Sequence, residues 1–202
     1  MRRTKEEAEL TRKNLLDAAL KVFSRQGYEA TRLEDVAEAA GVTRGAIYHH
    51  FGGKAELFQT LVEEASARGV NAVQRAIQDG TDFLDIARRV LVYTLQLMEE
   101  DPHYRQVIAL FLFQIGASPE LLAFKQQRVE HGRRDVEEIA GFFQMGIAQG
   151  AVRGDLDPFV AARAFLSYQN GLVLFWLSDP GSISVEADAE ALASVLIHGI
   201  AA

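Results

Sequence analysis

Apolar residues recur at three- and four-residue intervals along most of the chain, which is the spacing of an amphipathic helix. Three such stripes lie in the first sixty-five residues. They are Leu16, Ala19, Leu20 and Phe23, then Leu33, Val36, Ala37 and Ala40, and then Phe58, Leu61, Val62 and Ala65. Gly27 and Gly41 follow the first two stripes, and glycine is the usual residue just after a helix end. The pattern therefore predicts helices that end near these two glycines.

A very short helix is predicted between the second and third stripes. It runs over Arg44–Phe51, with Thr43 as a plausible N-cap, and the helix that carries the third stripe begins at Lys54. Thr31-x-x-Glu34 precedes the second stripe and has the pattern of a capping box.

Longer helical patterns fill the rest of the chain, near residues 82–100, 103–116, 119–149, 158–177 and 186–200. Each of the four prolines lies near a boundary of these patterns, where its missing N–H costs least. No strand-like alternation of useful length appears. We predict an all-α protein with a three-helix helix-turn-helix domain in residues 1–53 and a helical body in residues 54–202.

Composition narrows the class of protein. The chain has 202 residues and no cysteine, which excludes disulfides and Cys-ligated metal sites. The N-terminus has no apolar segment of a signal peptide, and apolar runs such as Gly171 to Leu177 are too short to span a bilayer. We expect a soluble, cytoplasmic protein without a membrane partner.

Charge is distributed unevenly along the chain. Residues 1–60 hold ten Lys/Arg and nine Asp/Glu, a net charge of +1, and the remainder hold eleven and nineteen, a net charge of −8, which together give the total of −7. This asymmetry hints at a polyanion-binding end on an acidic body, although surface charge often varies by this much.

The short third helix carries the candidate chemistry. The linker Ala-Gly-Val-Thr before it is typical of a helix-turn-helix. At 100° per residue, Ile47 and Phe51 share the side that docks on the second helix, whereas Gly45 and His49 face outward. A narrow outward face with N–H and O–H donors, next to a positive helix N-terminus, suits a DNA major groove.

Each of these residues also has a simpler interpretation. Arg44 alone is most often a solvated cation, Tyr48 a half-buried packing residue, and His49 and His50 surface histidines. A metal pair is disfavoured because adjacent helical residues point about 100° apart and no third ligand is near in sequence. It is their combination on one short helix, after a helix and a glycine turn, that favours groove binding.

These residues also carry a resemblance to a known family. The segments FSRQGY, TRLEDVAEAAGVTRGAIYHHF and GGKAELF, between about Thr11 and Leu61, resemble the DNA-binding domain of the TetR family of bacterial transcriptional regulators. The chain looks closest to the AcrR- and TtgR-like branch, which represses multidrug efflux pumps. The opening segment RRTKEEA and the later KQQR are similar to that branch too.

The resemblance implies a set of DNA-binding residues. By position these are Arg32, Thr43, Arg44, Gly45, Tyr48, His49, His50 and Lys54. Tyr48, His50 and Lys54 match phosphate contacts of the family, whereas Arg44 and His49 match positions that reach bases. Arg32 departs from the Thr or Ser often found at its position, and Gly53 replaces a commoner polar N-cap.

The last two predicted helices suggest an oligomer. The helix at 158–177 is apolar nearly all round, so it must be buried on two sides. The final helix has a clean stripe formed by Ala189, Leu192, Ala193, Leu196, Ile197 and Ile200. A single packed core is the alternative, but the resemblance implies a homodimer through these two helices.

Polar residues on apolar faces mark a possible ligand site. Gln114, Gln169 and Asn170 stand among large apolar side chains, and a buried amide needs a hydrogen-bond partner. An internal hydrogen bond or a buried water would satisfy each of them. The resemblance implies instead a largely apolar cavity for a small hydrophobic or aromatic inducer, and we predict that it is lined by Ile108, Phe111, Phe165, Gln169, Asn170 and Val173.

The predicted function is that of a ligand-responsive repressor, without cofactor or metal, which binds operator DNA as a homodimer and controls a multidrug efflux operon. A TetR-like activator, or a regulator of another pathway, is not separable from a repressor by sequence. A helical enzyme such as a di-iron bundle is disfavoured, because no histidine lies three residues after an acidic residue on a shared helix face.

Overall fold

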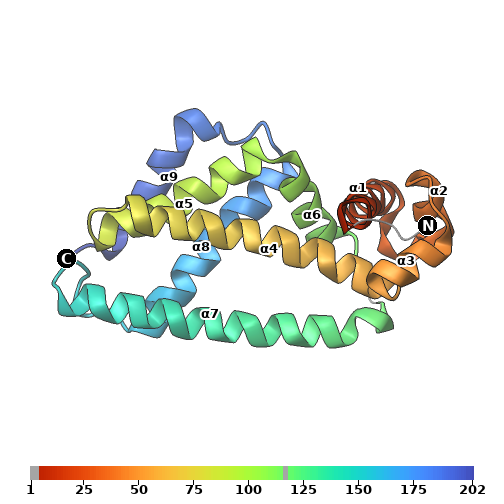
Figure 1. The fold of residues 1–202 in the computed structure, drawn as a ribbon. Helices are drawn as coiled ribbons and strands as arrows, with labels where there is room; N and C mark the ends of the chain where they lie inside the picture. Colours follow the sequence, from red (N-terminus) through yellow and green to blue (C-terminus); the bar gives the residue numbers. More distant parts are fainter. Residues whose placement is uncertain (1–4, 116–117) are drawn as a thin grey trace. The chain divides into compact units, whose positions relative to one another are not determined.

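The computed structural model describes residues 5–115 and 118–202, which form a succession of α-helices (Figure 1). The first four are α1 (Lys5–Ala30), α2 (Leu33–Ala39), α3 (Arg44–Phe51) and α4 (Lys54–Asp79). They are followed by α5 (Phe83–Glu100), α6 (Pro102–Phe113), the short 3-10 helix η1 (Pro119–Leu121), α7 (Leu122–Ala148), α8 (Pro158–Ser178) and α9 (Val185–Ile200). Over the described residues the extended pairing consists of one isolated bridge, Val152 with Ala201. The all-α prediction is confirmed.

Most helix boundaries agree with the sequence pattern to within one or two residues. The helix predicted at 103–116 is the exception, because α6 ends at Phe113, and residues 116 and 117 lie outside the described residues. The helix predicted from residue 119 begins as η1, with Pro119 in its first turn. Proline fixes φ and lacks an N–H, which suits the start of a tight helical turn.

Gly27 breaks α1 close to its C-terminal end. Its φ of 80° and ψ of 163° are non-helical, and the chain continues through a further short helical turn to Ala30. Because a positive φ costs glycine almost nothing, the predicted break occurs at the residue that tolerates it best. The backbone N–H of the next residue, Tyr28, donates to the carbonyl oxygen of Gln114 at 3.3 Å.

The start of α2 differs from the prediction. Arg32, not Thr31, stands at the N-cap, and Asp35 Oδ2 accepts from the Arg32 N–H at 3.0 Å. The Thr31 hydroxyl is buried and donates back to the carbonyl oxygen of Gly27 at 2.7 Å. The predicted Thr31–Glu34 capping box is therefore wrong by one residue. The Arg32 N–H, followed by the side-chain amide of Gln26, lowers the pKa of Asp35.

The described chain divides into two compact units. The first unit extends to Ala67 and includes Gln106–Phe124, and the second unit comprises Arg68–Arg105 and Lys125–Ala202. The division falls inside α4, α6 and α7 and does not coincide with residue 53. The functional boundary predicted after residue 53 stays a prediction.

Aromatic packing organises the core of the first unit. Phe23, Tyr28 and Phe58 are each fully buried, and the ring centroids of Phe58 lie 6.0 Å from Phe23 and 5.1 Å from Tyr28. Phe124 covers the other side of Phe58 at 6.1 Å. The predicted stripes face this core, since all their members are buried except the half-buried Ala40. This core holds α2 and α3 in place.

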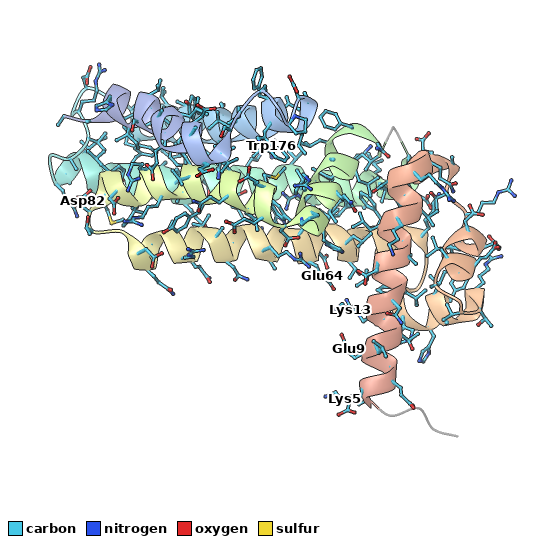
Figure 2. All side chains as sticks on the ribbon, turned by 90° about the horizontal axis from the view of Figure 1, so that it is seen from above. Lys5, Glu9, Lys13, Glu64, Asp82 and Trp176 are labelled. Atoms are coloured by element: carbon cyan, nitrogen blue, oxygen red, sulfur yellow. The ribbon has the colours of Figure 1, made fainter. Side chains whose placement is uncertain are left out.

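The second unit is a separate helical core. α5 packs on α8 and α9, and Figure 1 shows these helices side by side. Phe143 on α7 is buried between Phe83 and Phe165, with ring centroids at 5.5 and 6.0 Å. Trp176 on α8 is also buried and is labelled in Figure 2, and the Arg105 guanidinium lies 5.5 Å from its ring centre. Among the described residues, none of the helices has the length and hydropathy needed to cross a membrane.

Candidate DNA interface

The two faces of α3 divide as the helical projection predicts. Ile47 and Phe51 are buried, whereas Gly45, Tyr48 and His49 are exposed. Val36 on α2, which contacts α3, is also buried in the core of this unit. Burial of one side fixes the rotation of α3, so the outward residues keep a constant orientation.

A groove of about 600 Å³ lies beside this outward face, within the first unit. Its lining combines predicted DNA-binding residues with acidic residues for which the sequence predicts no role at the DNA interface. The lining residues are Thr31, Arg32, Leu33, Glu34, Arg44, Tyr48, Gly53, Lys54, Ala55, Glu56 and Glu120. Three cations and three carboxylates therefore face one another in the groove.

Arg44 is held by two neighbours. Its Nη1 donates to Glu34 Oε1 at 2.6 Å, and its Nη2 donates to the Tyr48 hydroxyl oxygen at 2.7 Å. The guanidinium carbon also lies 5.3 Å from the centre of the Tyr48 ring. The hydrogen bond to Tyr48 and the charge of Glu34 raise the pKa of Arg44. About half of the Arg44 side chain remains exposed.

Lys54 has a structural role that the sequence did not indicate. Its Nζ donates to the carbonyl oxygens of Tyr28 and Thr31, both at 3.2 Å, and pairs with Glu120 at 3.4 Å. The ammonium lies 4.4 Å from the centre of the Tyr28 ring. Burial, followed by the Glu120 side chain, raises the pKa of Tyr28, so this ring is a neutral phenol. Lys54 thus ties the start of α4 to the end of α1.

Lys54→Met is expected to lower the melting temperature of the DNA-free protein. Methionine keeps an apolar stem but removes the Lys54 donor from the Thr31 carbonyl and from the Tyr28 carbonyl, which retains only the Thr31 N–H at 3.3 Å. We expect this loss to cost about 1–3 kcal/mol. In a protein of this size that corresponds to roughly 2–10 °C in scanning calorimetry.

Lys13→Met supplies the matched control for this substitution. Lys13 is an exposed lysine on α1, labelled in Figure 2, and its replacement should leave the melting temperature within about 1 °C of the wild type. If Lys54→Met melts like the wild type, the structural role assigned to Lys54 is wrong.

The other predicted DNA-binding residues lie at or near this surface. Arg32 is exposed and lines the groove. Thr43 stands at the predicted N-cap of α3, but its hydroxyl makes no capping hydrogen bond. His49 is exposed and His50 is half-buried, with their ring centroids 5.2 Å apart. Across the described residues, no group of three or more His, Asp or Glu is placed to hold a metal ion.

The predicted ligand-binding residues are divided between the two units. Ile108 and Phe111 belong to the first unit, and Phe165, Gln169 and Val173 are wholly or partly buried in the second. For Gln169, the contacts favour an internal hydrogen bond, which is the alternative to a ligand contact. Gln169 Nε2 donates to the Thr94 hydroxyl at 2.7 Å, which is an internal hydrogen bond.

Asn170 and Gln114, by contrast, are exposed in the protomer. The expectation that these amides need partners inside an apolar face is therefore wrong for the single chain. The helical phase explains Asn170, because the buried side of α8 is set by residues such as Ala162, Phe165 and Trp176.

These features define a helical DNA-binding regulator, with an outward-facing recognition helix on a small N-terminal core. Comparison with known families gives the same result. Residues 15–61 match the model of bacterial regulatory proteins of the tetR family, and residues 82–201 match the C-terminal region of MAATS-type transcriptional repressors. The chain belongs to the TetR family of transcriptional regulators, which confirms the predicted resemblance.

Individual relatives match along nearly the whole chain. It is 32% identical to the HTH-type transcriptional regulator TtgR of Pseudomonas putida over 94% of this chain and 91% of that protein. It is 29% identical to the regulator AcrR of Shigella flexneri over 98% and 92%. The crystal structure of NalD, the secondary repressor of the MexAB-OprM multidrug efflux pump in Pseudomonas aeruginosa, is similar with a TM-score of 0.86, 27% identity and 98% coverage of both chains.

Proposed function

We propose that this chain is a dimeric repressor that binds the operator of a multidrug efflux operon and is released by a small hydrophobic or aromatic inducer. The observation that carries the DNA-binding part is the outward face of α3, where exposed Arg44, Tyr48 and His49 flank the side-chain-free Gly45. A helix with so narrow an outer surface can enter a major groove with its donors near base edges.

The residues divide into two roles on DNA. Arg44 and His49 read bases, whereas Arg32, Thr43, Tyr48, His50 and Lys54 contact phosphates. Tyr48 accepts from Arg44, so its own hydroxyl hydrogen is available to a phosphate oxygen. Lys54 keeps its two carbonyl partners and exchanges Glu120 for a phosphate. Gly45 allows close approach of the backbone.

Control of an efflux operon is supported by the relatives. NalD is described as a repressor of a multidrug efflux pump, and the similarity to it extends over 98% of this chain. A protein from Escherichia coli described as a probable acrEF/envCD operon repressor is 30% identical over 95% of this chain.

The inducer is proposed to bind in the second unit of the helical body, near Phe165, Gln169 and Val173. Most of these side chains are apolar, which suits a hydrophobic or aromatic molecule. Gln169 can still accept a hydrogen bond at its amide oxygen while its Nε2 donates to Thr94.

The homodimer is proposed to form through α8 and α9. The stripe that the sequence predicts on the final helix packs within the single chain, where Ala189, Ala193 and Ile200 are buried. The exposed stripes of α8 and α9 lie at other positions with helical spacing. The two stripes consist of Val160, Ala164, Ser167, Gly171 and Phe175 on α8 and of Ala187, Ala191 and Val195 on α9. Small and apolar side chains at this spacing let helices of a second copy approach closely.

The proposed function is tested by selecting an operator from random DNA and then adding aromatic compounds. We expect one near-palindromic sequence to be enriched, and a bound compound to lower the operator affinity in mobility-shift assays. A hundredfold release requires a compound to bind the free form about 2.7 kcal/mol more tightly than the DNA-bound form. Compounds that bind in calorimetry but leave the operator affinity unchanged would reject the ligand-responsive mechanism.

A further inference from the structure

The ion pair between Arg44 and Glu34 affects how strongly Arg44 attracts DNA phosphates and base edges. The two side chains come from different helices, α3 and α2, and meet at 2.6 Å while both remain more than half exposed. Tyr48, one turn after Arg44, binds the other end of the guanidinium fork at 2.7 Å. The side chain is therefore held at both terminal nitrogens before any DNA arrives.

Hydrogen-bond capacity remains on the fork. A guanidinium carries five N–H groups, of which Glu34 takes one from Nη1 and the Tyr48 oxygen takes one from Nη2. One hydrogen is left on each terminal nitrogen, together with the Nε hydrogen. Two terminal hydrogens are what a guanine edge needs, because its O6 and N7 accept in parallel.

The positive charge of Arg44, in contrast, is largely offset by the Glu34 carboxylate. A phosphate is drawn to an arginine mainly by its positive charge, and the adjacent Glu34 carboxylate offsets that attraction. A base edge is electrically neutral and is bound through directional hydrogen bonds, which the carboxylate does not remove. The pair therefore penalises a phosphate contact by Arg44 more than a base contact.

We propose that Glu34 is a specificity-determining positioning residue, which keeps Arg44 away from backbone phosphates and presents its fork to base edges. The proposal rests on the DNA-binding function proposed above. Glu34 does not contact DNA bases itself but acts through Arg44. Its main effect is to lower the affinity for random DNA, so that the ratio between operator and random DNA rises.

Glu34→Gln tests this role with little change in shape. The amide oxygen can still accept from Arg44, but the negative charge is gone. We expect the affinity for random DNA to rise about two- to fivefold, the range of an exposed ion pair, while the operator affinity rises less. The salt slope of log K on random DNA should steepen by about 0.9, because Arg44 then neutralises one more phosphate.

Glu56→Gln is the matched control, because Glu56 lines the same groove and makes no ion pair with Arg44. It should raise operator and random affinities by the same factor. The second control is Glu34→Gln in an Arg44→Ala background, where the effect on the ratio should disappear. Persistence of the effect without Arg44, or an unchanged ratio in the single variant, overturns the proposal.

The wild-type ratio separates this inference from the proposed function. If the wild type prefers its operator and Glu34→Gln leaves that preference unchanged, only the role of Glu34 falls. If the wild type binds all DNA equally, the repressor function falls, and the role of Glu34 falls with it.

Discussion

Val195→Asp is expected to convert the protein from a dimer into a folded monomer. Val195 on α9 is 67% exposed in the protomer and Phe175 on α8 is 59% exposed, so both project from the last two helices without covering in the single chain. In a dimer through these helices the new carboxylate would be buried without a partner, which costs several kcal/mol. In the monomer it would remain in water and leave the fold intact.

The affinity for the operator should fall strongly when the dimer is lost. Two recognition helices on one dimer bind the second half-site intramolecularly, which strengthens binding by about a hundredfold or more over one helix alone. Sedimentation velocity would report the mass, and mobility shift would report the affinity for the operator. We expect both to change in Val195→Asp.

Ile77→Asp is the appropriate control for this experiment. Ile77 on α4 is 54% exposed and also apolar, but it lies outside the proposed dimer helices. It should leave both the mass and the operator affinity unchanged. A native dimer in Val195→Asp, with full operator affinity, would move the interface to other helices.

Helices were predictable from sequence because burial in an all-α protein repeats every three or four residues. The stripe with Phe58, Leu61 and Val62 is almost completely buried, as its spacing predicts. The N-cap of α2 was less predictable, since a threonine hydroxyl can cap the helix that follows or bond back to the chain before it. Here the break at Gly27 leaves a free carbonyl oxygen, and Thr31 bonds to it.

The sequence predicts the cations of the candidate site but not their acidic partners. Its cations stand on one short helix and at the next helix start, where local spacing identifies them. Their acidic partners come from elsewhere, with Glu34 on α2 and Glu120 in η1, far along the chain from Lys54. The local sequence pattern predicts only a capping role for Glu34. No local pattern connects Glu120 to Lys54, because tertiary packing alone brings them together.

The surroundings of the two amide residues on α8 could not be predicted from the sequence either. Gln169 and Asn170 are adjacent, and sequence alone treats both as polar interruptions of an apolar helix. Their surroundings differ, because Gln169 reaches Thr94 inside the unit whereas Asn170 points to the exposed side. A shift of 100° along a helix is enough to exchange core for solvent, and an all-round apolar helix gives no phase from which to choose.

Arg44→Ala is expected to reduce operator affinity about tenfold or more and to relax the preference at one base pair of each half-site. The loss should be smaller on random DNA, because the Glu34 carboxylate already offsets the positive charge that a phosphate would attract. Fluorescence anisotropy on the selected operator, on operators changed at single base pairs and on random DNA would measure all three effects.

Arg44→Lys separates the shape of the side chain from its charge. Lysine can still pair with Glu34, but its single ammonium lacks the rigid planar fork whose two terminal nitrogens donate side by side to one guanine edge. If Arg44 reads a base through its fork, Arg44→Lys should lose the preference at the same base pair as Arg44→Ala, while its salt slope stays that of the wild type. Arg32→Ala should instead weaken operator and random DNA by one common factor and reduce the salt slope by about 0.9, as expected of a phosphate contact. An equal loss on operator and random DNA in Arg44→Ala would assign Arg44 to the backbone, and base reading would then rest on His49.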